Sequence, residues 1–387
     1  MNQTEIRRSR RLLSLTIIFF WASEYCHAPY FTPYLQTLGF AATTIGVITG
    51  LYGFTQMLVR IPLGMFTDAT GWYKRTIVGG TFCTTISSFG LMFATSLPAI
   101  LICRVLAGLA ASTWLAFTVL YNAYYAADES VQAMTNVNAF NSMGKFLAFI
   151  LGLITATLWG YKVPLVCSFL TGLAAMACAL FLKPIQLRRE SFQLKHAVQV
   201  MRNPAVICAA AFSVVMNFFL QGTVYSFTSG VAKSIGASAF EIGASTILFT
   251  LVQILGANLI GKKLLKKINA AQAISSGFLL LTVSCVLVGL AANMPMIYLA
   301  QIIGGGANLM MSSVLMAMIV RHTPQEKQST AMGLYQAVYG IGMAAGPVCV
   351  GGMVNAGGYA MAYLVTAGIV LLAGLAAPFA VSRADRD

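Results

Sequence analysis

The chain has 387 residues, of which 58% are hydrophobic and 9% are charged, and its mean hydropathy is +0.79. Because soluble proteins carry about 25% charged residues, this composition excludes a soluble domain and predicts an all-α integral membrane protein. The net charge is +14. The basic residues that produce it lie beside apolar segments, where they orient helices and contact membrane lipid. With no phosphate-binding loop and no zinc-finger spacing, we expect no nucleic-acid partner.

The apolar segments predict twelve membrane-spanning helices, since about 20 apolar residues cross a bilayer core. The first begins after a basic stretch and lacks a small-residue cleavage site, so we interpret it as a retained span rather than a signal peptide. Pro29 and Pro33 are expected to bend or break it. The predicted spans are residues 12–35, 42–66, 76–95, 98–123, 132–159, 163–183, 204–230, 240–262, 271–292, 295–319, 330–355 and 358–381.

The basic residues predict the orientation of these spans. Of the 24 lysines and arginines, nineteen fall in or beside the segments on the same side as the N-terminus, and Lys162 and Lys233 fall on the other side. The remaining three are Arg60, Arg104 and Lys145, within spans. Because cytoplasmic loops carry the excess of basic residues, we expect a multi-pass protein of the plasma membrane with both termini in the cytoplasm.

The two halves of the chain repeat each other. IGVITGLYGFTQMLVRIPLG begins at Ile45 and IGASTILFTLVQILGANLIG begins at Ile242, 197 residues later. Shared residues in this register indicate a parallel repeat of two pseudo-symmetric six-helix bundles. We predict bundles at residues 1–183 and 204–387, joined by a cytoplasmic linker at 184–203. The matched pairs are Gly46 and Gly243, Gln56 and Gln253, Gly64 and Gly261, Gly108 and Gly305, and, one residue further apart, Gly144 and Gly342.

The stretch GMFTDATGWYKR between spans two and three has the spacing G-x-x-x-D-x-x-G followed by basic residues. It resembles the loop signature of the major facilitator superfamily, with Ala69 where the family usually has arginine. In that family the aspartate and the basic residues latch the two halves together on the cytoplasmic side. The resemblance therefore implies a cytoplasmic gate formed by Gly64, Asp68, Gly71, Lys74 and Arg75.

Two further stretches carry the same resemblance. ILICRVLAGLAAS, which contains Arg104, looks like the family's fourth-helix motif, and GMAAGPVCVGG in span eleven resembles the glycine-proline motif of exporters. The copy of that motif expected in span five has Ala148 and Phe149 in place of glycine and proline. The resemblance implies the twelve-helix fold of the family, similar to the branch of drug and metabolite antiporters coupled to protons.

Charges inside the spans are costly, at about 2.5–3.5 kcal/mol or more for an ionised group near the bilayer centre. Glu24 is the only acid at such depth, and we interpret it as a proton-coupling group; a structural ion pair and direct substrate contact remain alternatives. Lys145, at similar depth in span five, is either the partner of Glu24 or an anchor for an anionic substrate. The residue that matches Glu24 in the second half is the uncharged Gln221.

For each of three other polar residues, two interpretations stay open. Arg104 assists proton transfer, as the resemblance implies, or packs as a hydrogen-bond donor. His27 shares a helical face with Glu24 and is a proton relay or a packing residue. Arg60 joins the gate with Asp68 or extends to the surface.

Further polar and aromatic residues are predicted to line a central pocket with Lys145, although some of the aromatic residues could instead serve packing. They are Tyr25, Tyr30, Asn141, Asn217, Gln221, Tyr225, Asn308, Gln336 and Tyr339.

These observations predict a monomeric secondary transporter that works by alternating access, without metal or cofactor. The deep charges sum to −1 from Glu24 and +2 from Arg104 and Lys145, which favours proton-coupled export of small anionic or amphipathic organic compounds. The alternatives are a proton symporter that imports a carboxylate or sugar acid, and a multidrug exporter of lipophilic cations. An enzyme is not expected, since three histidines and one deep acid offer little catalytic chemistry, and the short loops do not suit a receptor.

Overall fold

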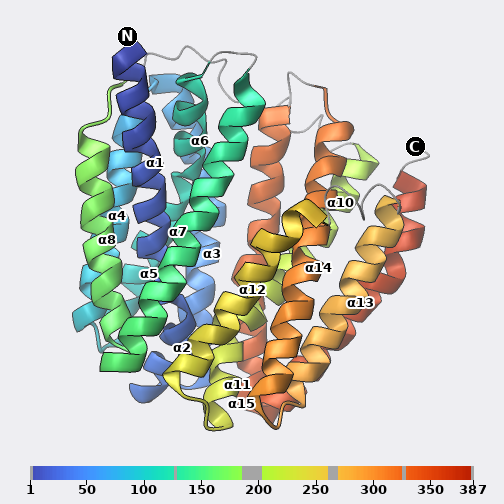
Figure 1. The fold of residues 1–387 in the computed structure, drawn as a ribbon. Coiled ribbons are helices and arrows are strands. Elements are labelled where there is room, and N and C mark those ends of the chain that lie inside the picture. Colours follow the sequence, from blue (N-terminus) through green and yellow to red (C-terminus); the bar gives the residue numbers. More distant parts are fainter. Residues whose placement is uncertain (1–2, 126–128, 185–202, 260–268, 325–327, 385–387) are drawn as a thin grey trace. The chain divides into compact units, whose positions relative to one another are not determined.

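The protein is described from a computed structural model (Figure 1), which covers residues 3–125, 129–184, 203–259, 269–324 and 328–384. The predicted linker at 184–203 and the basic residues within 260–268 fall almost wholly outside these ranges. Helices are the only regular secondary structure in the part of the chain so described. The described residues form two compact units, Met1–Tyr30 with Thr55–Phe192, and Phe31–Phe54 with Gln193–Asp387. The predicted bundle boundaries at 183 and 204 stay a prediction.

The first unit is built around α1. Here α1 packs against α7 and α8, and α4 packs against α5 and α8, as Figure 1 shows. The break after Ser112 makes α5 and α6 two consecutive pieces of one predicted span. The helices of this unit are α1 (Gln3–Tyr25), the part of α3 (Ala42–Thr70) from Thr55 onward, α4 (Tyr73–Phe93), α5 (Leu97–Ser112), α6 (Trp114–Ala123), α7 (Ser130–Trp159) and α8 (Val163–Leu180).

The second unit contains Phe31–Phe54, which includes most of α2 and the beginning of α3, and the second half of the chain. The stretch labelled α15, which is two helices separated by a kink at Gly357 and Gly358, contacts α10 and α13, and α14 contacts α12 and α13. The π-helix η2 directly continues α10. The elements are α2 (Ala28–Thr37), α10 (Pro204–Phe219), η2 (Leu220–Phe227), α11 (Thr228–Ser234), α12 (Ala239–Leu259), α13 (Ala270–Gly289), α14 (Met294–Arg321) and α15 (Gln328–Ala384).

The predicted spans correspond to helices of the structure. Ten stretches of the described residues are long and apolar enough to cross a membrane. One of these, Ala331–Arg383, contains two helices because Gly357 and Gly358 leave helical geometry. The first predicted span is not among the ten, since α1 begins with several arginines and ends before α2. When Ala331–Arg383 is counted as two helices and α1 is added, the described helices account for the twelve predicted spans. The all-helical fold class is confirmed.

Apolar side chains cover the outer surface of these helices. Phe379 is 81% exposed and Phe181 is 69% exposed, as are many leucines and isoleucines to a smaller degree. Contiguous exposed apolar surface of this kind is rare in soluble monomers. It suits contact with lipid, which confirms a multi-pass membrane protein.

One matched pair of glycines in the repeat, Gly144 and Gly342, occupies equivalent contacts. A Cβ on Gly144 would meet the Ile18 carbonyl and the Trp21 side chain, and a Cβ on Gly342 would meet the backbone of Val214 and Phe218. In each half, therefore, a helix later in the chain packs on the first helix through a glycine. Close approach of this kind requires the absence of a side chain.

The first span breaks where its prolines were expected to break it. α1 ends at Tyr25, Cys26 and His27 form a turn, and α2 begins at Ala28 with Pro33 inside it. The backbone N–H of Tyr30 bonds to the His27 carbonyl at 3.0 Å. The sequence prediction of a broken first span is thus confirmed.

Candidate functional site

α4 carries a column of small hydroxyl side chains within an otherwise apolar helix. Thr81, Thr84, Thr85, Ser87 and Ser88 are all buried. Buried hydroxyls need hydrogen-bond partners. Thr81 and Thr85 donate to carbonyls of α4 itself, whereas Thr84, Ser87 and Ser88 have partners on α1 or α5. The column therefore provides a polar strip deep in the membrane span, beside α1 and α8.

Glu24 of α1 faces this strip. It is 8% exposed, and the Thr84 hydroxyl donates a hydrogen bond of 2.5 Å to its Oε1. Arg104, on α5, is likewise buried, at 9% exposed.

His27 is connected to the same strip by a different route. Its Nδ1 pairs with the Ser168 hydroxyl of α8 at 2.9 Å. Ser23 donates to the Ser168 backbone carbonyl at 2.7 Å and lies 3.2 Å from the Thr84 hydroxyl. His27 and Glu24 are therefore linked through Thr84, Ser23 and Ser168. A carbonyl oxygen interrupts the chain of hydroxyls, so it is not a continuous path for a proton.

Lys145 of α7 takes a different position from Glu24. Its Nζ lies 4.7 Å from the ring centroid of Trp21 and 4.7 Å from that of Tyr25. Neither Lys145 nor Glu24 takes part in an ion pair among the described residues. The described residues therefore give no ion pair between Lys145 and Glu24, and the role of Lys145 as an anchor for an anionic substrate stays a prediction.

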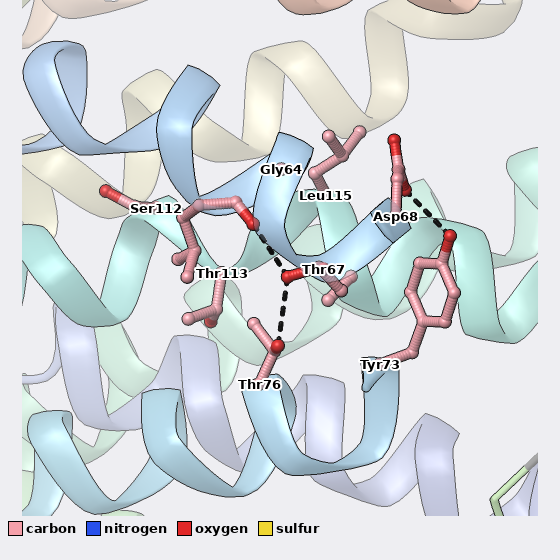
Figure 2. Close-up of a pocket in the computed structure, with 10 residues that line it drawn as sticks. Gly64, Thr67, Asp68, Tyr73, Thr76, Ser112, Thr113 and Leu115 are labelled. Atoms are coloured by element: carbon pink, nitrogen blue, oxygen red, sulfur yellow. Dashed lines mark hydrogen bonds between the residues drawn. The ribbon is translucent and has the colours of Figure 1, made fainter. Parts of the chain in front are cut away.

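The predicted gate motif lines a small pocket at the end of α3 (Figure 2). Asp68 accepts a 2.7 Å hydrogen bond from the hydroxyl of Tyr73, and Thr67 and Thr76 are joined at 3.0 Å. Gly71 has φ of +68°, a conformation that glycine adopts without strain. The acid near the end of α3 is thus held by the tyrosine that begins α4.

The basic residues of the motif lie around this loop. The Arg75 guanidinium is 4.3 Å from the Trp72 ring centroid, and Lys74 is half-buried. Arg60 is only 5% exposed and donates to the Ala111 carbonyl at 3.4 Å. Its guanidinium therefore does not extend to the surface, and that part of the prediction is wrong because a carbonyl of α5 binds it inside the unit.

The remaining pocket residues of the first unit have different surroundings. Tyr25 is half-buried and lies edge-on to Phe149, with ring centroids 5.9 Å apart. Tyr30 has no exposed surface and stacks on Tyr161 at 6.0 Å. Asn141 is half-buried. Tyr25 is therefore accessible beside Lys145, whereas Tyr30 is part of the packing.

The predicted residues of the second unit come from α10, η2, α14 and α15. Asn217 is buried and donates to the Ser213 carbonyl of its own helix at 2.9 Å. Asn308 is buried, and its Oδ1 has no hydrogen-bond partner in the described part of the chain. Tyr225 lies edge-on to Phe249, and Tyr339 lies edge-on to Tyr335. Gln221 and Gln336 are half-buried.

Sequence reasoning did not identify Thr84, Ser168 or Tyr73 as partners of the predicted site residues. A signal for Thr84 exists, because the run TFCTTISSFG places hydroxyls at helical spacing inside a span. Tyr73 occupies a position where the related motif usually has a basic residue, which hides its role as a donor.

Apolar helices long enough to cross a membrane, with ionisable side chains buried between them, suit a membrane transporter. The sequence profile of the Major Facilitator Superfamily matches residues 13–229 and 207–387. The chain therefore belongs to the major facilitator superfamily.

Relatives of the chain agree with this assignment. It is 25% identical over 373 residues to an uncharacterized MFS-type transporter of Methanocaldococcus jannaschii, covering 92% of this chain and 94% of that protein. The fold is similar to a bacterial homolog of the human lysosomal transporter Spinster, solved inward-facing and unoccupied, with a TM-score of 0.81, 15% identity and coverage of 100% and 98%. It is also similar to the nucleoside transporter NupG, with a TM-score of 0.76, 15% identity and coverage of 98% and 99%.

Proposed function

We propose that this transporter couples proton movement to the export of small anionic or amphipathic organic compounds by alternating access. Glu24 carries the proton, and Lys145 with Trp21 and Tyr25 binds the anionic group of the substrate. The export direction rests on the resemblance of the Arg104 stretch to the fourth-helix motif of antiporters. Asp68 and the basic residues after it form the gate on the cytoplasmic side.

The observation that carries the proposal is the separation of the acid from the cation around α1. Glu24 is bound by Thr84 of α4, whereas Lys145 of α7 lies over the rings of Trp21 and Tyr25. Had Glu24 and Lys145 paired, each would have neutralised the other and neither charge would serve a ligand. Held apart, each is available to its own partner.

The surroundings of Lys145 support an anionic ligand. Placing an ammonium inside a span costs about 2.5–3.5 kcal/mol, and a cation–π contact returns about 0.5–2 kcal/mol. The rings therefore orient the ammonium without neutralising it. A carboxylate, phosphate or sulfonate on the substrate would complete the charge balance, and the aromatic faces would hold an adjacent apolar group.

The surroundings of Glu24 support proton coupling. A buried carboxyl group changes from charged to neutral when it takes a proton, and a bilayer interior penalises the charged form. Thr84 and the charge of Arg104 favour the charged form. A carboxyl under these opposing influences can take up and release a proton as its exposure to water changes during transport.

A thermal-shift ligand screen on the purified protein at low and high pH tests the proposal. We expect organic anions to stabilise the wild type, and Lys145→Met to weaken their binding by about tenfold or more while neutral ligands bind as before. Lys145→Arg, which keeps the cation, is the matched control. Equal loss for anions and neutral ligands would contradict the anchor role, and stabilisation by lipophilic cations alone would favour a multidrug exporter.

A further inference from the structure

The first unit contains a second hollow besides the pocket at the gate motif, and Lys145 does not line it. It is an open groove of about 590 Å³ at the N-terminal end of α1, bordered by the end of α6 and by α7. Its polar lining comprises Arg7, Arg10, Arg11, Ser14, Tyr121, Tyr125 and Asn136. The distribution of basic residues predicts that this end faces the cytoplasm.

The floor of the groove is a connected hydrogen-bond network. The Arg10 guanidinium lies 3.7 Å from the centroid of the Tyr125 ring and donates to the Tyr124 carbonyl at 2.7 Å. Asn136 donates to the Tyr125 hydroxyl at 3.1 Å, and the hydroxyls of Tyr121 and Tyr125 are 3.2 Å apart. Because these contacts join α1, α6 and α7, the polar groups are fixed before any ligand arrives, which lowers the entropy cost of binding.

The charge of the groove is positive. Arg10 lies 3.8 Å from Glu129, and Glu5 pairs with Lys183 outside the groove. Arg7 and Arg11 line the groove with exposed side chains, and no ion pair involves either of them among the described residues. Arg7, Arg10 and Arg11 together carry a charge of +3, and Glu129, which pairs with Arg10, carries −1. Among the described residues the net charge of this group is therefore +2.

The opposite end of the groove is apolar. Leu15, Ile18 and Phe140 continue its lining toward the membrane interior. At a rise of 1.5 Å per residue, the seven residues from Arg11 to Ile18 span about 10 Å. The groove thus presents guanidinium groups at one end and hydrocarbon at the other, a polarity that matches an anionic head group with an attached alkyl chain.

We propose that this groove binds the anionic head of an amphiphile, a phosphate or carboxylate joined to a hydrocarbon chain. Arg7 and Arg11 bind the anion, Arg10 and the tyrosine hydroxyls border it, and the chain lies along Leu15, Ile18 and Phe140. The ligand is either a lipid of the surrounding leaflet or a free amphiphile from the cytoplasm. The site is separate from Lys145 and does not depend on the substrate proposed above.

Dodecyl phosphate, titrated by calorimetry into the full chain in a neutral detergent, tests this site. We expect saturable binding that weakens about tenfold or more in Arg7→Gln/Arg11→Gln. Arg8→Gln is the matched control, because Arg8 is an exposed neighbour on the same helix that does not line the groove. Inorganic phosphate, which lacks the chain, and dodecylphosphocholine, which lacks the net charge, should each bind much more weakly than dodecyl phosphate.

Equal binding of dodecyl phosphate by the double variant and the wild type would overturn the proposal, as would an equal loss in Arg8→Gln. Lys145→Met should leave this binding unchanged, so failure here and failure of the substrate proposal are distinguishable. Protein in phosphatidylcholine vesicles with and without phosphatidylglycerol then separates the two sources. If phosphatidylglycerol competes with dodecyl phosphate, the groove binds membrane lipid. If phosphatidylglycerol does not compete, the groove binds a free amphiphile.

Discussion

The first helices of the two halves depart from regular α-helix at matching positions. In the first half α1 ends at Tyr25 and α2 begins at Ala28, and in the second half the π-helix η2 covers Leu220–Phe227. The position 197 residues after Tyr25 is Gly222, which lies within η2. The two irregularities therefore fall at matching positions of the repeat. Prolines account for the first, but no proline lies within the second. Irregular helix at a common depth is therefore a property of the shared scaffold, and such turns often mark functional sites.

The side chains around the two irregularities differ completely. At an offset of 197, Glu24 corresponds to Gln221, Thr84 to Leu281 and Arg104 to Gln301. His27 likewise corresponds to Val224. The second half keeps the shape but has no ionisable group at these four positions. At these positions the ionisable groups are therefore confined to the first copy of a common scaffold, which is where we propose that the proton binds.

Moving the acid from one half to the other should have the largest effect. In Glu24→Gln/Gln221→Glu the acid is moved to position 221. The second half has Leu281 and Gln301 at the positions that match Thr84 and Arg104, so the moved acid has neither a matching hydroxyl donor nor a matching cation. We expect no transport driven by a pH gradient in proteoliposomes. Glu241→Gln, which removes an exposed acid bound to Ser238, is the control and should transport normally. Recovery of half the wild-type rate in the double variant would show that the position of the acid is unimportant.

Substitution of the packing glycines tests whether a helix packs on the first helix in the same way in both halves. Gly144→Ala and Gly342→Ala each place a Cβ against backbone of the first helix of that half, so each should destabilise the protein by about 1–3 kcal/mol. Gly79→Ala, with open space around it, should be neutral or slightly stabilising. Thermal unfolding in detergent measures all three. A large loss in only one of the two matched variants would contradict equivalent packing.

Thr84 tests how far the first half depends on its added polar strip. Thr84→Val keeps the shape but removes the donor to Glu24, and hydrogen bonds to charged groups contribute about 1.5–3 kcal/mol. We expect pH-driven transport to fall about tenfold, with Thr84→Ser close to the wild type. If valine and serine behave alike, the hydroxyl has no part in coupling.

The gate loop should give the smallest effect. The second half has Leu265 where the first has Asp68, so a charge-based latch belongs to one copy only. Asp68→Asn should raise labelling of cysteines placed on the cytoplasmic side, because it weakens closure there. Tyr73→Phe, which removes one neutral donor, should raise it by about fivefold at most. Labelling that is unchanged in both variants would count against the latch.

The sequence predicted the spans, the repeat and the broken first helix, because hydropathy, spacing and proline geometry are local properties. It did not predict the π-helix, which lacks a local signal, or the partners of the deep charges. Hydropathy gives the depth of Glu24 and Lys145 in the membrane but not the direction each faces around its helix. That direction depends on how α1 packs against α4 and α7, so the pairing of Lys145 with Trp21 and Tyr25 followed only from tertiary structure.

Proton movement coupled to substrate, recorded with a pH-sensitive dye inside proteoliposomes, tests the central claim most directly. The wild type should move protons when an organic anion that it binds is added to one side. Glu24→Gln should still exchange labelled anion across the membrane but move no protons with it. Proton movement at the wild-type rate in Glu24→Gln would contradict the account, because the proton would then bind elsewhere.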